Sequence, residues 1–379
     1  MVLDFTLLTE KQIWGDKDGN GQLDVMKEYG TKVAPTDLAV ILGGQVSGTY
    51  YNRTSEGETT CVSWSASPEK GAADVQCIDF GGGKGSWEWP NYRYIPVRPA
   101  LPPSETEKLT STNRKTGVNG VDIIEYGEYP QTVADEETCK KLEKLHESSS
   151  LHPTGKNYIF DSVDPTESRA SFEAISYPEY ELDGKKYIRV PGRPYSESSR
   201  LSTKELIMEG EPYWVKVQPI EWLMDKSGWM VSKKCLFAGI QFDTETGYRG
   251  DFSKTFMKLY FDAYFATEIE PSELIAEKRE KVIKGLNEKL SEISDLEKVK
   301  ETITPARTPE RTDILARITR VRKAKSLLSK AAQKAQKEGD KKTLEEIIEM
   351  AKPYAAREAV VLDKFHQRQA ERRAQKGRE

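Results

Sequence analysis

The stretch TTCVSWSASPEKGAADVQCIDFGGGKGSWEW, residues 59–89, decides the fold class of this chain. Apolar and polar residues alternate at 59–67 and again at 74–80, which is typical of strands. A loop joins these two segments, and a glycine-rich turn at 81–85 leads into a third strand that carries Trp87 and Trp89 on one face. The spacing therefore predicts a small antiparallel sheet made of hairpins.

Helices and strands mix along the rest of the first 270 residues, which indicates an α+β fold. The pattern predicts a short helix at 23–30, a short helix or turn at 37–44, and longer helices at 135–147 and 252–269. Further strands are expected at 213–224 and 228–242. Asp183-Gly184 lies inside the segment 180–190 and suits the tight primed turn of a β-hairpin.

Charge and aromatic content divide the chain. The net charge is −4 overall, but residues 271–379 carry +8 and residues 1–270 carry −12, and all 7 Trp precede residue 271. We therefore predict a module at 1–104, a polar linker at 105–120, a second α+β module at 121–268 and an all-α basic tail at 269–379.

The tail carries an apolar stripe. Ile314, Val321, Leu328 and Ala335 recur at seven-residue intervals, which predicts self-association or docking to a partner helix. The tail lacks stacking aromatics and its charges are mixed, so we expect a solvated helical face rather than a nucleic-acid interface.

Composition excludes several classes of protein. A mean hydropathy of −0.67 and the lack of a long apolar run argue against a membrane protein. The opening segment has no standard secretion signal, so a cytoplasmic protein, or one associated with a virion or mobile element, is expected. The 4 Cys and 3 His are scattered without metal spacing, and no catalytic constellation can be drawn, which favours a non-enzymatic protein.

The segment 16–24, DKDGNGQLD, matches the first nine positions of a calcium loop. Position 12 of the loop would be Lys27 instead of a bidentate carboxylate, so the alternative is a polar turn before a helix. Calcium is the one cofactor that the sequence suggests. Its candidate ligands are Asp16, Asp18, Asn20, Gln22 and Asp24.

The glycine-rich segment 81–85, GGGKG, allows a phosphate-loop interpretation. A phosphate loop requires Ser or Thr directly after the lysine and a helix beyond it. Here Gly85 follows Lys84, and a strand-like segment comes next. We therefore predict a β-hairpin turn at this position.

Several of these segments also carry a family resemblance. WSAS at 64–67, VQCIDF at 75–80, the glycine turn and IPVRPAL at 95–101 occur in a succession that resembles the C-type-lectin-fold variable proteins of diversity-generating retroelements. Residues 11–268 also resemble an uncharacterised domain family of gut Firmicutes. The closing-type segment (61–101) precedes the opening-type segment (124–242), so the order of the two is swapped, and we expect them to associate.

The resemblance implies a C-type-lectin-like fold and a strand-and-turn surface that binds a ligand. By analogy, polar positions of the strands and turn would contact this ligand. Apart from the resemblance, the aromatic side chains near these strands also suit ligand recognition; the alternative is that they fill the core. The expected contact residues are Ser63, Ser65, Asp74, Gln76, Asp79, Lys84, Ser86, Trp87, Glu88, Trp89, Asn91 and Tyr92.

The function expected from this reasoning is non-enzymatic binding of a protein or glycan by the surface around residues 63–94. One alternative is a structural or assembly protein of a phage or mobile element, in which the helical tail carries the interaction. The other is an enzyme of unknown chemistry.

Overall fold

The computed structural model describes residues 3–47, 59–68, 74–109, 113–117, 119–167, 172–243, 248, 250–270, 284–285, 323–336 and 343–352. The chain divides into two units, Met1–Ser272 and Glu273–Glu379. The first unit contains helices and antiparallel sheets, so the predicted α+β class is confirmed.

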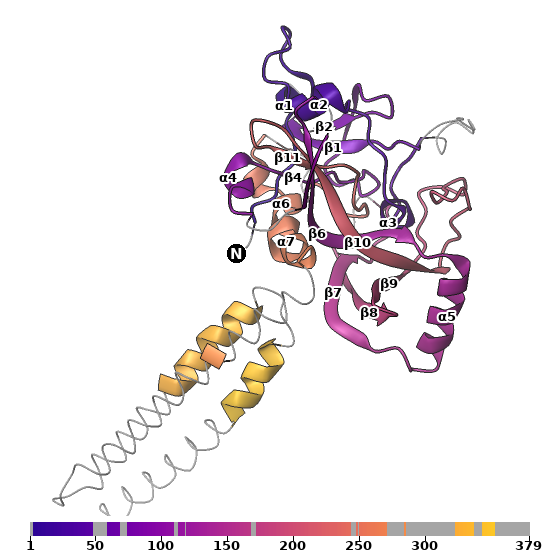
Figure 1. Cartoon of the computed structure of the whole chain (residues 1–379), viewed down its shortest axis with the longest axis vertical. Coiled ribbons are helices and arrows are strands. Elements are labelled where there is room, and N and C mark those ends of the chain that lie inside the picture. Colours follow the sequence, from indigo (N-terminus) through magenta and orange to yellow (C-terminus); the bar gives the residue numbers. More distant parts are fainter. Residues whose placement is uncertain are drawn as a thin grey trace, which may run out of the picture. The chain divides into compact units, whose positions relative to one another are not determined.

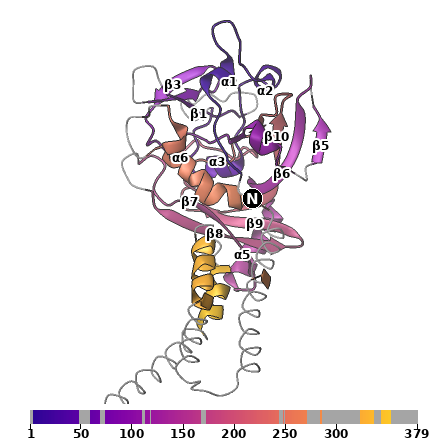
Figure 2. The same cartoon turned by 90° about the vertical axis from the view of Figure 1, so that its left-hand side faces the viewer.

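An antiparallel eight-stranded sheet forms the centre of the first unit. Its two longest strands, β6 and β10, lie side by side (Figure 1), and β5 is the outermost strand beside β6 (Figure 2). The strands in order are β4 (Ala100–Leu101), β11 (Met230–Ser232), β10 (Pro212–Met224), β9 (Lys185–Pro191), β8 (Ala174–Leu182) and β7 (Pro153–Asp161), with β6 (Asp122–Val133) paired to β10 and β5 (Asn113–Thr116) paired to β6.

The turn between β8 and β9 confirms the predicted hairpin. Asp183 has a φ of 52° and Gly184 a φ of 71°, as a two-residue primed turn requires at both central positions. Asparagine, aspartate and glycine tolerate this left-handed backbone better than other residues, so these two residues determine the turn and with it the strand register.

The smaller sheet is formed by three strands between residues 63 and 88. Its order is β1 (Ser63–Pro68), β2 (Val75–Ile78) and β3 (Lys84–Glu88), all antiparallel, as predicted. The first four residues of β1 and all four of β2 are buried. Other parts of the unit therefore cover both faces of these strands.

Short helices surround the sheets. The predicted helices at 23–30, 37–44 and 135–147 are confirmed. The one predicted at 252–269 is interrupted: a 3-10 turn ends at the extended residue Thr255, and the helix that follows contains a π-helical turn. The helical elements are α1 (Glu10–Trp14), α2 (Asp24–Glu28), α3 (Asp37–Ile41), α4 (Pro103–Thr106), α5 (Glu136–Glu147), the 3-10 helix η1 (Phe252–Lys254), α6 (Phe256–Tyr260), the π-helical η2 (Phe261–Phe265) and α7 (Ala266–Glu268).

Aromatic side chains join the helix η2 to the main sheet. The ring of Phe265 lies 5.0 Å from that of Phe5, 5.3 Å from that of Tyr129 and 5.5 Å from that of Phe237. All four side chains are fully buried. Each such ring removes a large apolar area from water, so this cluster stabilises the contact between the helix and the main sheet.

The two modules expected at 1–104 and 121–268 form one unit. Leu101 and Ala100 of β4 pair with Met230 and Val231 of β11, so the first module supplies a strand to the sheet of the second. The segment 105–120, expected to be a linker, contains β5 and therefore differs from the prediction. Its strand adds to β6 through four residue pairs.

The helical tail has its own small core. Leu328 and Ala335 of the predicted stripe are buried together with Ala324 and Ile347, so the described helical stretches 323–336 and 343–352 cover this part of the stripe. Ile314 and Val321 lie outside the described residues.

Candidate ligand-binding surface

Four aromatic rings form a continuous row, here called the aromatic ladder: Trp89, Tyr92, Tyr94 and Tyr195. Ring centroids are 5.8 Å apart between Trp89 and Tyr92, 4.9 Å between Tyr92 and Tyr94, and 4.9 Å between Tyr94 and Tyr195. Trp89 is 49% exposed, and the three tyrosines are partly exposed. The ladder therefore presents aromatic surface to solvent at the end of β3.

Backbone hydrogen bonds hold the segment that carries the first three rings. Asp243 donates its N–H to the carbonyl of Pro90, and Gly239 donates to that of Arg93, both at 2.9 Å. On the other side, Gln45 donates to the carbonyl of Tyr94 at 2.8 Å. These bonds fix the backbone of residues 90–94 against the second module. The loss of backbone conformational entropy when a ligand binds to the rings is therefore small.

Arg93 anchors the ladder from beneath. Its side chain is fully buried, and its Nε donates to Oδ2 of Asp161 at 2.9 Å, while a terminal nitrogen donates to the carbonyl of Glu167 at 2.6 Å. Successive side chains of an extended segment point to opposite faces. The inward direction of Arg93 is thus consistent with the outward position of Tyr92 and Tyr94.

The carboxylates of Glu88 and Asp74 lie near the ladder. The Tyr94 hydroxyl donates to Oε2 of Glu88 at 3.2 Å. Burial, and then the carboxylate of Glu88, raise the pKa of Tyr94 well above its usual value. Burial and the carboxylates of Glu88 and Asp74 also raise the pKa of Tyr92. The tyrosines therefore stay neutral at physiological pH and present hydroxyl groups as well as ring faces.

Two buried amide atoms near the ladder have no hydrogen-bond partner in the described part of the chain. They are Oδ1 of Asn91, next to Tyr92, and Nε2 of Gln241, on the segment that faces residues 90–93. Gln241 is 1% exposed. Buried polar atoms are normally satisfied, so a hydrogen bond from water or a ligand group would be favourable at each of them.

Three of the predicted contact residues are buried instead of exposed. Ser63 and Ser65 are fully buried and Gln76 is 3% exposed. Ser65 donates to the carbonyl of Gln76 at 2.8 Å, and the Gln76 amide donates to the carbonyl of Gly85 at 2.9 Å. The side chains of Ser65 and Gln76 thus link strands of the small sheet, and the burial of all three residues corrects their assignment to the ligand surface.

Two further predicted residues belong to the glycine-rich turn. Asp79 accepts hydrogen bonds from the N–H groups of Gly81 and Gly83, both at 2.8 Å, and thereby shapes the turn that was predicted in place of a phosphate loop. Lys84 is exposed, forms an ion pair with Glu10 and lies over the ring of Trp14 at 5.8 Å. Both residues thus have structural partners in the first unit.

The remaining predicted residues gather at the ladder. Trp89 and Tyr92 are part of it, while Glu88, Asn91 and Asp74 lie beside it. The side chains of Ser86 and Trp87 lie outside the described residues. Sequence reasoning did not find Tyr195, because it lies about a hundred positions along the chain and no local pattern links it to Tyr94.

The predicted calcium loop folds as a polar turn between α1 and α2. Oδ1 of Asp16 accepts the backbone N–H groups of Asn20 at 2.9 Å and Asp18 at 3.0 Å, and these bonds lower the pKa of Asp16. The Asp24 carboxylate pairs with Lys27 at 3.2 Å, and the Gln22 amide donates to a backbone carbonyl. Within the described ranges, no group of three or more His, Cys, Asp or Glu side chains is placed to hold a metal ion.

Calcium binding at this loop stays a prediction. Calorimetry with millimolar CaCl₂ is expected to show a saturable heat that Asp18→Asn weakens by about tenfold or more, because each lost carboxylate lowers the affinity of such loops. The absence of any heat from the unaltered protein would end the calcium hypothesis. The segment would then be a structural turn only.

A second cluster of ionisable groups is buried under α7. Lys156 and Glu268 are 6% and 4% exposed, and burial lowers the pKa of Lys156 while it raises the pKa of Glu268 to about 8. Lys156 donates to the carbonyl of Glu270 at 2.6 Å, and Glu268 accepts the N–H of Ile159 at 2.7 Å. These bonds attach the end of the unit to β7.

No family model, curated protein or solved structure matches this chain. The class that the fold defines is an α+β protein built on antiparallel sheets. In the described part of the chain, every helix is too short or too polar to cross a lipid bilayer.

Proposed function

We propose that this protein is a non-enzymatic ligand-binding protein with a C-type-lectin-like core, which recognises a protein or a glycan through the aromatic ladder. The observation that supports it is the half-exposed indole of Trp89, stacked on Tyr92 at the end of a row of rings. Large exposed aromatic side chains on a fixed backbone are typical of binding hot spots.

The resemblance to variable proteins of diversity-generating retroelements supports the same function. In that family, polar residues of strands and turns contact the ligand, and four of the positions carried over from it lie at the ladder or beside it: Asp74, Glu88, Asn91 and Tyr92. The backbone bonds of residues 90–94 supply the rigidity that such a surface needs. This arrangement suits ligand recognition rather than catalysis.

Trp89 is the residue whose loss should weaken binding most. We expect ligands enriched from a random peptide library or a glycan array on the full chain to lose at least tenfold in affinity with Trp89→Ala. Truncation removes a ring that stacks against the ligand, and hot-spot aromatics cost about 2 kcal/mol or more when truncated. The measurement is the dissociation constant of each selected ligand for the two proteins.

A matched control distinguishes the ladder from the helical tail. Ile348 is 48% exposed, the same as Trp89 within a percentage point, but belongs to the tail. Ile348→Ala is expected to leave the affinity for ligands of the ladder unchanged. Ligands that tolerate Trp89→Ala but lose affinity with Ile348→Ala would contradict the proposal and favour an assembly protein whose tail carries the interaction.

A further inference from the structure

We infer that the aromatic ladder binds a cationic group, namely a lysine or arginine side chain of a partner protein. This inference rests on the proposed function and names the ligand chemistry of the same surface. It depends on two features of the ladder: the exposed ring of Trp89 at its end, and the carboxylates of Glu88 and Asp74 beside it.

The charge near the ladder is negative. Among the described residues, Glu88 and Asp74 are the ionised groups that act on the Tyr92 hydroxyl, and both are acidic. Residues 1–270 carry a net charge of −12, so the wider field of this part of the chain also attracts cations. A lysine or arginine of a partner would meet complementary charge, whereas an acidic group would be repelled.

The rings supply the second half of the recognition. The face of an aromatic ring is electron-rich and attracts an ammonium or guanidinium group within about 6 Å, most strongly in the case of tryptophan. Trp89 rests on Tyr92 at an interplanar angle of 27°, and about half of its surface remains in contact with solvent. The exposed indole is therefore the expected contact for the cation.

The chain uses the same combination within its own fold. The Lys156 ammonium lies 5.0 Å from the centre of the Tyr158 ring and 3.5 Å from Oε1 of Glu128. Lys84 similarly lies over Trp14 and pairs with Glu10. Of the described residues, no lysine or arginine lies over the rings of Trp89, Tyr92 or Tyr94. The ladder likewise places an aromatic ring beside carboxylates, which is the combination that holds Lys156 and Lys84.

The test uses the full chain labelled with 5-fluorotryptophan, with the Trp89 signal in the ¹⁹F NMR spectrum assigned by its loss in Trp89→Phe. The probes are Nα-acetyl-lysine methylamide, its norleucine analogue, which lacks the ammonium group, and methyl glucoside as a neutral sugar. We expect the lysine probe to shift the Trp89 signal saturably at millimolar concentration, and the norleucine probe to bind at least about fivefold more weakly.

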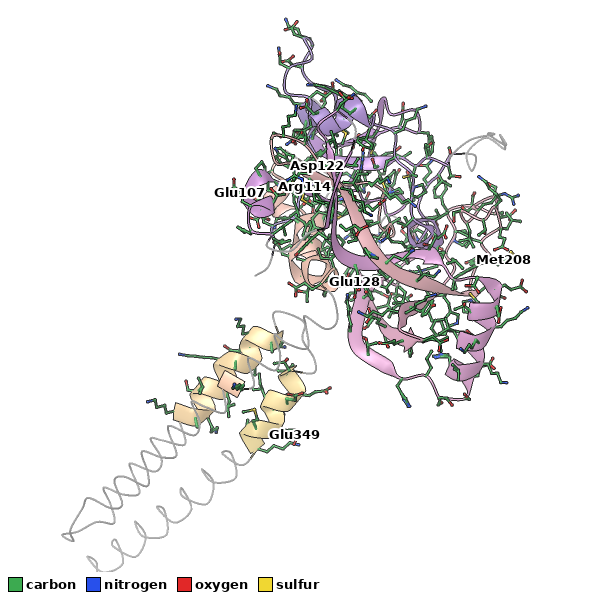
Figure 3. All side chains as sticks on the ribbon, in the orientation of Figure 1. Glu107, Arg114, Asp122, Glu128, Met208 and Glu349 are labelled. Atoms are coloured by element: carbon green, nitrogen blue, oxygen red, sulfur yellow. The ribbon has the colours of Figure 1, made fainter. Side chains whose placement is uncertain are left out.

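Charge at the ladder is tested separately. Glu88→Gln keeps a side-chain oxygen that can accept the hydrogen bond of the Tyr94 hydroxyl, so the fold should persist. The substitution is expected to lower the affinity for the lysine probe about three- to tenfold at low salt, and by less at high salt. Glu107→Gln, at an exposed glutamate on the outside of the unit (Figure 3), should leave the affinity unchanged.

The outcomes separate this inference from the proposed function. Equal affinity for the lysine and norleucine probes, or no shift with any probe, would overturn the cation inference. Binding of methyl glucoside but not of the lysine probe would also overturn it, yet would leave the ladder as a glycan surface. The proposed function itself fails only if library ligands ignore Trp89→Ala.

Discussion

Asp161→Asn is expected to lower the free energy of unfolding of the first unit by about 3–5 kcal/mol, the usual cost of leaving one member of a buried ion pair without its partner. Arg93 and Asp161 are both fully buried and lie 2.9 Å apart. Asparagine fills nearly the same volume, so the change removes charge rather than packing.

The hydrogen bonds of Asp161 make this substitution specific. Its Oδ1 accepts the N–H groups of Val163 at 3.1 Å and Glu173 at 3.0 Å, and the asparagine side-chain oxygen can keep both. Only Oδ2, which faces Arg93, is exchanged for an amide. The guanidinium then loses the negative charge of a fully buried carboxylate, which is the costly change.

Tryptophan fluorescence during denaturant unfolding measures the effect in the full chain, because all 7 Trp lie before residue 271. The exposed pair of Lys140 and Glu136 is the control: Glu136→Gln should leave the midpoint almost unchanged. Arg93→Met combined with Asp161→Asn should cost less than the two single changes added together. Strict additivity, or a loss below about 1 kcal/mol for Asp161→Asn, would contradict the role assigned to this pair.

The small sheet shows which structural features the sequence can predict and which it cannot. Period-two alternation correctly predicted β1, β2 and β3, because it reports which residues share a face of a strand. It does not report which face is covered. Ser63 and Ser65 share the polar face of β1, yet both are buried because the rest of the unit packs against that side as well.

Strand β6 was missed for a related reason. Its sequence contains Gly127 and Pro130, and few of its positions are buried, so no apolar alternation marks it. Gly127 has a φ of 69°, and two register shifts interrupt the pairing of β6 with β10. Long-range pairing with β10 stabilises this irregular strand, and that information is absent from the local sequence.

The candidate site was predicted in part. Trp89 and Tyr92 could be named because aromatic residues follow a predicted strand, and Glu88, Asn91 and Asp74 could be named by resemblance. Tyr195 and Arg93 could not, since their roles arise from the contact between 89–94 and segments more than sixty residues away. Contacts between distant segments are set by the tertiary fold and leave no periodic signal.

Glu268→Gln is expected to change how stability depends on pH. Burial raises the pKa of Glu268 to about 8 in the folded protein, and its bond to the Ile159 N–H and the nearby Lys156 only partly offset this. The folded protein therefore holds this proton more tightly than the unfolded chain, whose glutamates have a pKa of about 4.3.

The sign follows from proton linkage. The stabilisation from the protonated carboxyl is complete below the unfolded pKa and is lost as the pH rises through the folded pKa, so it falls by on the order of 3–4 kcal/mol between pH 5 and 9. Glutamine cannot ionise, and its side-chain oxygen can still accept the Ile159 N–H. The stability curve of Glu268→Gln should therefore lack this decline.

The informative quantity is the free energy of unfolding of the unaltered chain minus that of Glu268→Gln, followed from pH 5 to 9. Lys156, whose pKa is lowered by burial, contributes in the opposite sense above its folded pKa, and it cancels largely in the difference because both proteins retain it. For Glu107→Gln, at an exposed position, the free energy of unfolding should change with pH in parallel with that of the unaltered chain. If the free energy of unfolding of Glu268→Gln also changes with pH in parallel with that of the unaltered chain, the carboxyl is already ionised in the folded protein. Lys156 must then be its counter-charge beneath α7.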